Sequence, residues 1–475
     1  MPAHRRLDNR TADQNDSSVA VRPKSVALVR PSWEFPASHR DPFIHNRLFA
    51  PLSLAVTAAM LRQRGHAVRI VDAHALRLRP DQVAGLIRGC HQVFVTSSSL
   101  DRWECPNVEI TPFVHCVRRL APRCDELYVL GVHGTVRPHQ VLRETGARAA
   151  ILGEPELAVL EIAGGRDLAR IPGMCLWDAG EPRVTPGNRE LLDLDAVPLP
   201  AFDLLPMERY SHAMMGPRSV MLEASRGCPY RCTTCLQAMY GPRYRRKGAA
   251  TLIREVRHAV ERHGARNVIY IDMEFCLNRG PIEELCDFLT STGYDLRWCC
   301  TTRADAVDSD LLRRMKAAGC ALVNYGVESG DQAVVDGLNK RLELGHVEQA
   351  IRLTREAGID SLAFFMFGLP GESWDQMRET ARYSVRLAPD YVSYHVFTPY
   401  PCTAAFDQVG APELPLFPAT SGEHDDRALR RFVRQAMLRF YLRPDFFLRT
   451  ARRLWRQREL RPVLDQGRLF LSYLR

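Results

Sequence analysis

The stretch EASRGCPYRCTTCLQ occupies residues 223–237 and places Cys228, Cys232 and Cys235 in the spacing Cys-x3-Cys-x2-Cys. Soft thiolates suit iron–sulfur clusters, so three of them on one short loop can each bind one iron of a cubane cluster. The fourth iron would lack a protein ligand and could bind another molecule. A zinc site is the alternative, but zinc prefers a second Cys or His pair, and none follows within the next 20 residues. The spacing therefore favours an iron–sulfur loop.

The cysteine loop follows the first of six short apolar runs, and helical patterns separate each run from the next. This alternation indicates βαβ units and a parallel sheet. Six units are fewer than the eight of a closed TIM barrel, so we expect a partial (β/α)6 barrel over residues 218–405, with the cysteines at a strand's carboxyl end, where barrel enzymes keep their chemistry. The expected strands are 219–225, 267–272, 296–301, 321–328, 361–368 and 391–397.

An earlier series of alternating patterns predicts a second parallel sheet over residues 25–165. Five strands within this length suit a doubly wound, Rossmann-like α/β domain that binds a nucleotide or cofactor. The expected strands are 25–30, 67–72, 92–98, 126–131 and 149–153. The remaining segments are predicted to be a disordered polar leader (1–24), a linker rich in Pro, Gly and Asp (166–217), and a basic helical C-terminal extension (406–475).

The composition is that of a soluble globular protein, with 46% hydrophobic and 25% charged residues. No run of about 18 apolar residues predicts a membrane span, and the N-terminus has no signal-peptide core, so we expect a cytoplasmic location. Most of the other cysteines are expected to be small buried hydrophobes, because disulfide frameworks are rare in the cytoplasm. These are Cys90, Cys116, Cys124, Cys175, Cys286, Cys299, Cys300 and Cys320.

The net charge of +9 is concentrated at the C-terminal end, where residues 427–475 hold 14 arginines and three acidic residues. The rest of the chain is therefore slightly acidic. Arginines that alternate with apolar residues are typical of a helix with one packed and one solvated face. A contact with an acidic partner or RNA is the alternative.

The segment SRGCPYRCTTC resembles the cluster loop of the radical S-adenosylmethionine (SAM) superfamily. Later segments resemble the basic segment and the strand-end motifs of that family's barrel, namely RYRRK (243–247), IDMEF (271–275), TTRAD (301–305), YGVESG (325–330), FGLPGES (367–373) and TPYPCT (398–403). The N-terminal segments PLSLA, GHAVRIVDA, VTSSS, LGVHGT and LGEPE resemble the cobalamin-binding domain of one subgroup. Over residues 25–405 the chain thus resembles the radical SAM enzymes that contain a cobalamin-binding domain.

This resemblance implies a 4Fe–4S cluster on the three cysteines and SAM chelated to the open iron. The expected SAM contacts are Asp272 and Glu274 for the ammonium group, Arg303 for the carboxylate by a bidentate contact, Glu328 and Ser329 for polar groups, and Gly368 for close approach of the adenosine. An ordinary ion pair is the alternative for Arg303. The residue before the third cysteine is commonly aromatic in the superfamily, and Thr234 here puts the adenine contact in doubt.

Cobalamin is implied at the carboxyl edge of the first sheet, at its switch point. The loop residues expected against its nucleotide tail are Ser97, Ser98, Gly131 and Thr135. Many cobalamin proteins ligate cobalt through a His in Asp-x-His-x-x-Gly. Asp72-Ala73-His74 lacks that glycine and follows the second strand rather than the first, so we expect no axial histidine.

The implied function is a C-methyltransferase for a small-molecule, specialised-metabolite substrate. Hydrogen abstraction by a 5′-deoxyadenosyl radical would precede methyl transfer from methylcobalamin, with an external electron donor of the flavodoxin or ferredoxin type. The alternative within the family is a cyclase or oxidoreductase without net methylation. An iron–sulfur electron carrier would not need the strand-end motifs. An RNA-modifying enzyme would be expected to add an RNA-binding module, and none is recognisable after residue 405, so no nucleic-acid partner is expected.

Overall fold

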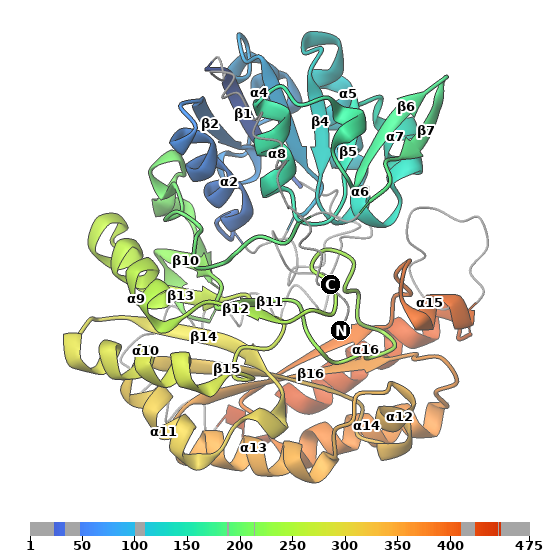
Figure 1. Cartoon of the computed structure of the whole chain (residues 1–475). Coiled ribbons are helices and arrows are strands. Elements are labelled where there is room, and N and C mark those ends of the chain that lie inside the picture. Colours follow the sequence, from blue (N-terminus) through green and yellow to red (C-terminus); the bar gives the residue numbers. More distant parts are fainter. Residues whose placement is uncertain are drawn as a thin grey trace, which may run out of the picture.

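The computed structural model describes residues 23–33, 48–99, 110–187, 190–212, 214–409, 423–444 and 446–447. Two sheets, one from each half of the chain, lie one above the other with helices around them (Figure 1). Within these ranges no helix is both long enough and apolar enough to cross a membrane. Residues 1–22 of the predicted leader and the last 28 residues of the chain lie outside the described residues.

The first sheet has the strand order β2-β1-β3-β4-β5-β6-β7. Its parallel strands are β1 (Ser25–Arg30), β2 (Ala67–Asp72), β3 (Gln92–Thr96), β4 (Leu127–Leu130) and β5 (Ala149–Ile151). Its helices are α2 (Leu52–Gln63), α3 (Ala73–Leu76), α4 (Pro80–Leu86), α5 (Thr111–Leu120), α6 (Val132–Val136), α7 (Pro138–Thr145) and α8 (Glu156–Ala163). The strand order reverses between β1 and β3, which makes this a doubly wound sheet with its switch point there.

The sheet continues past residue 165, where the sequence predicts the linker to begin. Strands β6 (Met174–Asp178) and β7 (Glu181–Val184) add to β5 in antiparallel pairing. The remainder of the predicted linker forms only short pieces, such as β8 (Ser211–His212) and β9 (Gly216–Pro217). The first domain therefore reaches about 20 residues further along the chain than the apolar runs suggest.

The second sheet has six parallel strands in the order β10-β13-β14-β15-β16-β17. They are β10 (Ser219–Leu222), β13 (Asn267–Tyr270), β14 (Arg297–Thr302), β15 (Cys320–Glu328), β16 (Asp360–Phe367) and β17 (Tyr391–Val396). The helices between and after them are α9 (Ala249–Arg257), α10 (Arg279–Thr292), α11 (Ser309–Ala317), α12 (Gln332–Gly337), α13 (Leu344–Glu356), α14 (Trp374–Leu387) and α15 (Ala404–Val409). The described strands do not close into a ring, so the expected partial barrel is confirmed.

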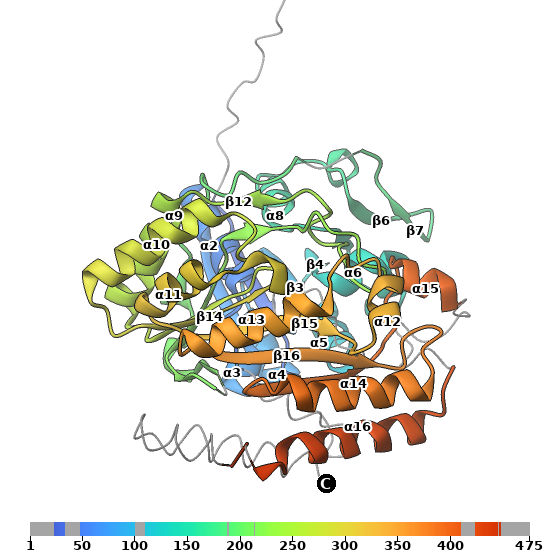
Figure 2. The same ribbon diagram turned by 90° about the horizontal axis from the view of Figure 1, so that it is seen from below.

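Helix α16 (Asp426–Tyr441) belongs to the predicted C-terminal extension and packs along α14 and the edge strand β17 (Figure 2). Its buried side chains are Leu429, Val433, Ala436, Met437 and Phe440. Arginines on its other side face solvent. Where the structure describes it, the extension is thus the expected helix with one packed and one solvated face.

Candidate active site

The three cysteines lie in the connection between two short antiparallel strands, β11 (Ser225–Arg226) and β12 (Arg245–Arg246). We call residues 227–244 the cysteine loop; it begins shortly after the carboxyl end of β10. Cys228 is buried, Cys232 and Cys235 are half-buried, and all three thiols are free of disulfides. The structure therefore presents the three thiols where the sequence predicts them, at a strand's carboxyl end.

Segments from later in the barrel brace the cysteine loop. The amide of Thr233 donates to the carbonyl of Leu338 at 2.9 Å, and the side-chain amide of Asn339 donates to the carbonyl of Arg231 at 2.9 Å. The amide of Ala405, at the start of α15, donates to the carbonyl of Thr233 at 3.0 Å. These contacts fix the cysteine loop to the segments that follow β15 and β17.

The chain enters the loop through a tightly held segment. The carboxylate of Asp272 accepts the amide of Ala224 at 3.0 Å and the hydroxyl of Ser225. Gly227 then has a φ of +77°, and a Cβ atom there would lie 2.4 Å from the carbonyl oxygen of Arg243. Only glycine fits this position without displacing backbone.

The two strand-end carboxylates predicted to contact SAM, Asp272 and Glu274, both accept hydrogen bonds from backbone amides. Besides the bonds of Asp272, Glu274 accepts the amide of Arg303 at 2.7 Å and the hydroxyl of Thr302. Asp272 is 3% exposed and Glu274 is 0% exposed, and this burial raises the pKa of each carboxyl group to about 7. The two groups therefore change charge near neutral pH while anchoring the segments on either side of the site.

Burial also dominates the electrostatics of the cysteine thiols. It raises the pKa of Cys228 to about 11, and it raises the pKa of Cys232, which nearby Lys340 lowers in part. Among the described residues, no three His, Cys, Asp or Glu side chains converge closely enough to hold one metal ion. The thiolates on a cubane cluster bind separate irons, whereas a zinc site needs its ligands around one ion.

Arg303, predicted to pair with the SAM carboxylate, is engaged within the chain. Its guanidinium forms a bidentate pair with Asp305 at 2.8 and 2.7 Å and donates to the carbonyls of Lys340 at 2.7 Å and Arg341 at 2.9 Å. It also lies over the ring of Tyr230, 3.9 Å from the centroid. In this arrangement Arg303 joins the cysteine loop to the segment that carries Lys340.

Lys340 is the cation that the sequence interpretation missed. Its ammonium lies 2.6 Å from Glu328, a predicted SAM contact whose backbone has a φ of +71°. Burial opposes the charge of Lys340, but Glu328 and Cys232 raise its pKa above the ordinary value. A lysine ten residues after the YGVESG segment was the available sequence signal. Its position beside the cysteine loop depends on the turn after α12, which the sequence pattern did not reveal.

Ser329 and Gly368 have structural partners. The hydroxyl of Ser329 pairs with that of Thr380 at 2.8 Å. Gly368 donates its amide to Glu372 at 2.9 Å, and a Cβ atom there would lie 2.8 Å from a methyl carbon of Leu429 on α16. The C-terminal extension thus packs directly on the strand end where the adenosine was expected.

The loops predicted to hold the cobalamin tail are bonded mainly to each other. The hydroxyls of Ser97 and Ser98 accept the amides of His133 at 3.2 Å and Val132 at 3.1 Å. A Cβ atom on Gly131 would lie 2.8 Å from both hydroxyl oxygens. The structure therefore brings these residues together, as expected at adjacent strand ends, and uses the two hydroxyls to hold the start of α6.

The cysteine loop meets the first domain at these strand ends. The hydroxyl oxygen of Thr135 lies 3.2 Å from the sulfur of Met239, and a Cβ atom on Gly153 would lie 3.4 Å from the carbonyl oxygen of Met239. Leu236, Met239 and Tyr240 of the cysteine loop pack into a hydrophobic cluster of the first domain. The two regions predicted to bind cofactors therefore face each other across the domain boundary.

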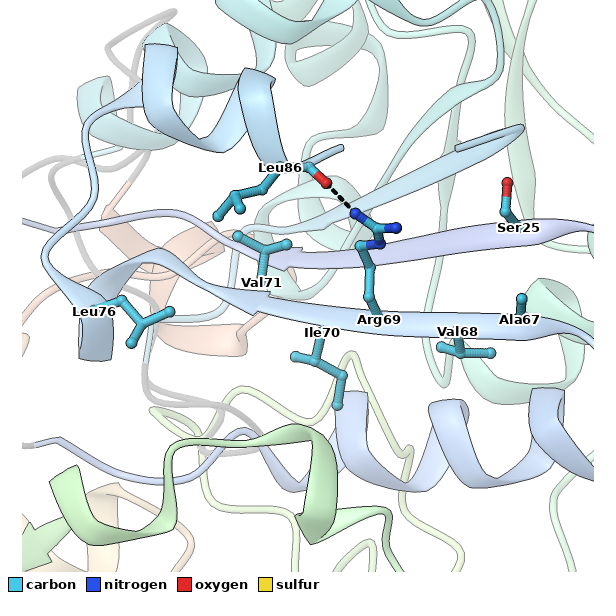
Figure 3. A pocket seen from close by; sticks show the side chains of 8 residues that line it. All are labelled: Ser25, Ala67, Val68, Arg69, Ile70, Val71, Leu76 and Leu86. Atoms are coloured by element: carbon cyan, nitrogen blue, oxygen red, sulfur yellow. Dashed lines mark hydrogen bonds between the residues drawn. The ribbon is translucent and has the colours of Figure 1, made fainter. Parts of the chain in front are cut away.

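A shallow groove lies elsewhere, along the edge strand β2 and the end of α4 (Figure 3). Arg69 crosses it to donate to the carbonyl of Leu86. The residues that line the groove are Ser25, Ala67, Val68, Arg69, Ile70, Val71, Leu76 and Leu86. None of them is a predicted site residue.

Comparison with known proteins agrees with this arrangement. Residues 222–384 match the model of the Radical SAM superfamily. A protein of Pyrococcus horikoshii named as an uncharacterized methyltransferase is 26% identical over 421 residues, which cover 84% of this chain and 89% of the relative. The anaerobic magnesium-protoporphyrin IX monomethyl ester cyclase of Rubrivivax gelatinosus is 28% identical over 379 residues, covering 76% of this chain and 66% of the cyclase.

Two solved structures share the overall fold. TsrM from Kitasatospora setae, a radical SAM methyltransferase with cobalamin and a [4Fe–4S] cluster bound, has a TM-score of 0.66 at 20% identity. That match covers 82% of this chain and 75% of TsrM. OxsB, a cobalamin-dependent radical SAM enzyme, has a TM-score of 0.71 at 17% identity, covering 94% of this chain and 72% of OxsB. The expected fold class, two α/β domains followed by a helical part, is confirmed.

Proposed function

We propose that this chain, which carries a radical SAM domain and shares the fold of TsrM and OxsB, is a cobalamin-dependent radical SAM C-methyltransferase acting on a small-molecule, specialised-metabolite substrate. The observation that carries the proposal is the direct contact of the cysteine loop with the strand-end loops of the first domain, at Thr135 and Met239. A substrate held at this boundary could reach groups bound on both sides. Relatives named as methyltransferases, matched over most of the chain, support the reaction type.

The residues present fit an iron–sulfur cluster. Cys228, Cys232 and Cys235 lie outside any disulfide on one braced loop, and the ammonium of Lys340, 2.6 Å from Glu328, lowers the pKa of the Cys232 thiol in part. A cation here would favour thiolates and would attract a carboxylate such as that of SAM. We therefore assign the cluster to these cysteines and the SAM carboxylate to the neighbourhood of Lys340, with Arg303 holding that segment in place.

The fit to a corrinoid rests on the fold rather than on single side chains. The doubly wound sheet presents its strand ends to the barrel, and such sheets bind cofactors at that edge. Ser97 and Ser98 are buried and turn their hydroxyls to the backbone of the β4–α6 connection. We therefore assign cobalamin to this edge of the sheet without assigning a ligand atom to these serines.

When bound, the cluster with SAM supplies a 5′-deoxyadenosyl radical and the corrinoid supplies a methyl group. The protein's part is to place and shield these groups. Asp272 and Glu274 fix the backbone at the ends of β10 and β14, and burial keeps water from both carboxylates. Lys340 supplies positive charge, and the electron comes from an external donor of the flavodoxin or ferredoxin type.

The test needs no knowledge of the substrate. Full-length protein is reconstituted anaerobically with iron and sulfide, loaded with hydroxocobalamin, reduced, and given SAM carrying a trideuterated methyl group. Mass spectrometry should find 5′-deoxyadenosine, S-adenosylhomocysteine and a corrinoid that carries the intact labelled methyl group. The Cys228→Ala variant should form no 5′-deoxyadenosine. His74→Ala should leave the spectrum of bound cobalamin unchanged, because the imidazole Nδ1 accepts the amide of Trp33 at 3.3 Å in the first domain.

A cyclase or oxidoreductase without net methylation is the second candidate, favoured by the similarity to the magnesium-protoporphyrin cyclase. It predicts 5′-deoxyadenosine without S-adenosylhomocysteine or labelled corrinoid. With the true substrate in hand, the methyltransferase should consume two SAM molecules per turnover and give both nucleoside products in equal amounts. Retention of the protein on RNA at moderate salt would instead support a nucleic-acid substrate.

A further inference from the structure

The base of the cysteine loop is a very short antiparallel pair. Strands β11 and β12 have only two residues each, with Ser225 opposite Arg246 and Arg226 opposite Arg245. All three predicted cluster ligands lie between these strands, in residues 227–244. Whatever holds Arg226 opposite Arg245 therefore holds the two ends of the loop together.

This pairing opposes two positive charges, which destabilises an isolated antiparallel pair. One carboxylate from the other domain contacts both arginines. Oε2 of Glu154 lies 2.7 Å from Nη1 of Arg226 and 3.3 Å from Nη1 of Arg245, and its Oε1 accepts from Nη2 of Arg245. Glu154 follows β5 of the first domain, so a residue of one domain bridges the two strands that carry the loop of the other.

The rest of the Arg226 guanidinium is held in the same way. Its Nη2 donates to Glu156 at 2.8 Å and to Glu223 at 3.0 Å, and its Nε lies 3.2 Å from both oxygens of Glu223. Glu156 is the first residue of α8, also in the first domain. Arg226, Glu156 and Glu223 are each 1–2% exposed. Water cannot replace a lost partner in such a buried group, so each carboxylate matters.

Neighbouring packing leaves the loop base little freedom to adjust. The guanidinium of Arg226 lies 5.6 Å from the ring centroid of Tyr240, which is itself in the cysteine loop. On the far side, Lys247 is 2.7 Å from Glu255 and 3.7 Å from Glu223. The pair of short strands lies on the side of the barrel that faces the first domain (Figure 1). A change at Glu154 would therefore displace the cysteine loop, because the neighbouring side chains cannot rearrange to compensate.

We propose that Glu154 and Glu156 of the first domain are positioning residues that clamp Arg226 and Arg245, and that this interdomain clamp governs how firmly the cysteine loop retains its iron–sulfur group. The inference rests on the proposed function for the identity of that group. It adds a role for the first domain in holding the cluster, besides binding a cofactor of its own.

The test compares iron release from anaerobically reconstituted full-length variants. Glu154→Gln keeps the shape of the side chain but removes the charge and turns an amide donor toward the arginines. We expect the rate of iron transfer to a coloured chelator to rise roughly tenfold or more, because a buried ion pair loses one partner. Glu156→Gln should act in the same direction. Glu154→Asp should lie between the parent and Glu154→Gln, because it retains the charge but reaches less far.

Two controls separate positioning from general destabilisation. Asp203→Asn breaks an exposed pair with Arg62 of the first domain, whose side chains are 56% and 39% exposed, and should leave iron release unchanged. Val26→Ala opens a cavity in the core of the first domain, where Val26 is 1% exposed and lies in a hydrophobic cluster that contains no residue of the cysteine loop. Thermal midpoints of the iron-free proteins are measured beside the release rates. Faster release in Glu154→Gln than in Val26→Ala, at equal or smaller loss of thermal midpoint, supports the clamp.

Release rates within twofold of the parent in folded Glu154→Gln and Glu156→Gln would overturn the inference. The inference would also be overturned if, in all variants, the rate of iron release rose in proportion to the loss of thermal midpoint. If the parent chain itself forms no cluster on reconstitution, the proposed function fails. If the parent forms a cluster and the clamp variants retain it equally well, only the clamp inference fails.

Discussion

Replacing Gly227 with alanine should disturb the cysteine loop far more than the same change at Gly241, although both glycines lie in that loop. Gly227 has a φ of +77° and Gly241 has a φ of +68°, so both substitutions place an L-residue in the left-handed region. The difference is space. At Gly241 a Cβ atom would meet nothing within 4 Å, whereas at Gly227 it would lie 2.4 Å from the carbonyl oxygen of Arg243 and 2.9 Å from that of Gly241.

The magnitudes follow from these contacts. The left-handed conformation costs an alanine about 1–2 kcal/mol, which is the whole effect expected for Gly241→Ala. At Gly227 the obstructing atoms are backbone, so residues 241–243 must move, and overpacking of this kind adds about 1–3 kcal/mol. For a unit of about 200 residues, 1 kcal/mol lowers the thermal midpoint by about 2–4 °C. We therefore expect a small shift for Gly241→Ala and one about twice as large for Gly227→Ala.

The assay pairs calorimetry of the iron-free proteins with iron analysis after reconstitution. Gly227→Ala should lose most of its bound iron, because Cys228 is the next residue and moves with the displaced backbone. Gly241→Ala should keep the parent's iron content. Equal thermal shifts and equal iron content in the two variants would refute the steric argument.

Three further outcomes test other parts of the site. Cys228→Ala should abolish the iron–sulfur absorbance of the reconstituted protein, whereas Cys299→Ala, in the barrel core, should retain it. Lys340→Met should raise the pKa of the Cys232 thiol, because the positive charge that lowers it is removed. Iodoacetamide should then alkylate Cys232 more slowly at pH 8 in the iron-free protein, and an unchanged rate would contradict the prediction. The folded-state pKa of Asp272 is about 7 and its ordinary value is 3.8, so its contribution to stability is full below pH 3.8 and is lost as pH rises through 7. Urea unfolding at pH 5 and pH 8 should therefore show Asp272→Asn gaining stability relative to the parent at the higher pH.

Most strands could be predicted because both sheets bury their central strands on both faces. Such strands appear in the sequence as continuous apolar runs, as in β1 (Ser25–Arg30), whose predicted and observed bounds are the same. Strands β6 and β7 escaped prediction; β7 lies at the edge of the first sheet, and the last two residues of its neighbour β6 are exposed. Three of the four residues of β7 (Glu181–Val184) are exposed, so no apolar run marks it.

The site shows a similar division between local and long-range information. The three cysteines could be found because their spacing within eight residues is itself the signal. The contacts of Arg303 could not, because the carbonyls that hold it belong to Lys340 and Arg341, which only the folded barrel brings near. The predicted SAM and cobalamin contacts stay predictions, although the proposed function assigns the SAM carboxylate to the neighbourhood of Lys340 rather than to Arg303. Several of these residues also form hydrogen bonds within the chain. Glu154 was quoted only as part of a motif, since its role depends on a contact between domains.

Tyr441 at the end of α16 has a consequence for how copies of this protein behave toward one another. Its hydroxyl accepts the amide of Val392 at 3.1 Å and donates to the carbonyl of the same residue at 2.9 Å. Val392 lies on β17, the last strand in the order of the second sheet, so the phenol takes the place that a seventh strand would fill. An uncovered edge of this kind is a template for strand exchange and fibrous aggregation. Helix α16 opposes such association in two ways. It covers the edge of the sheet, and it exposes arginines such as Arg430 and Arg434, whose like charges keep neighbouring molecules apart.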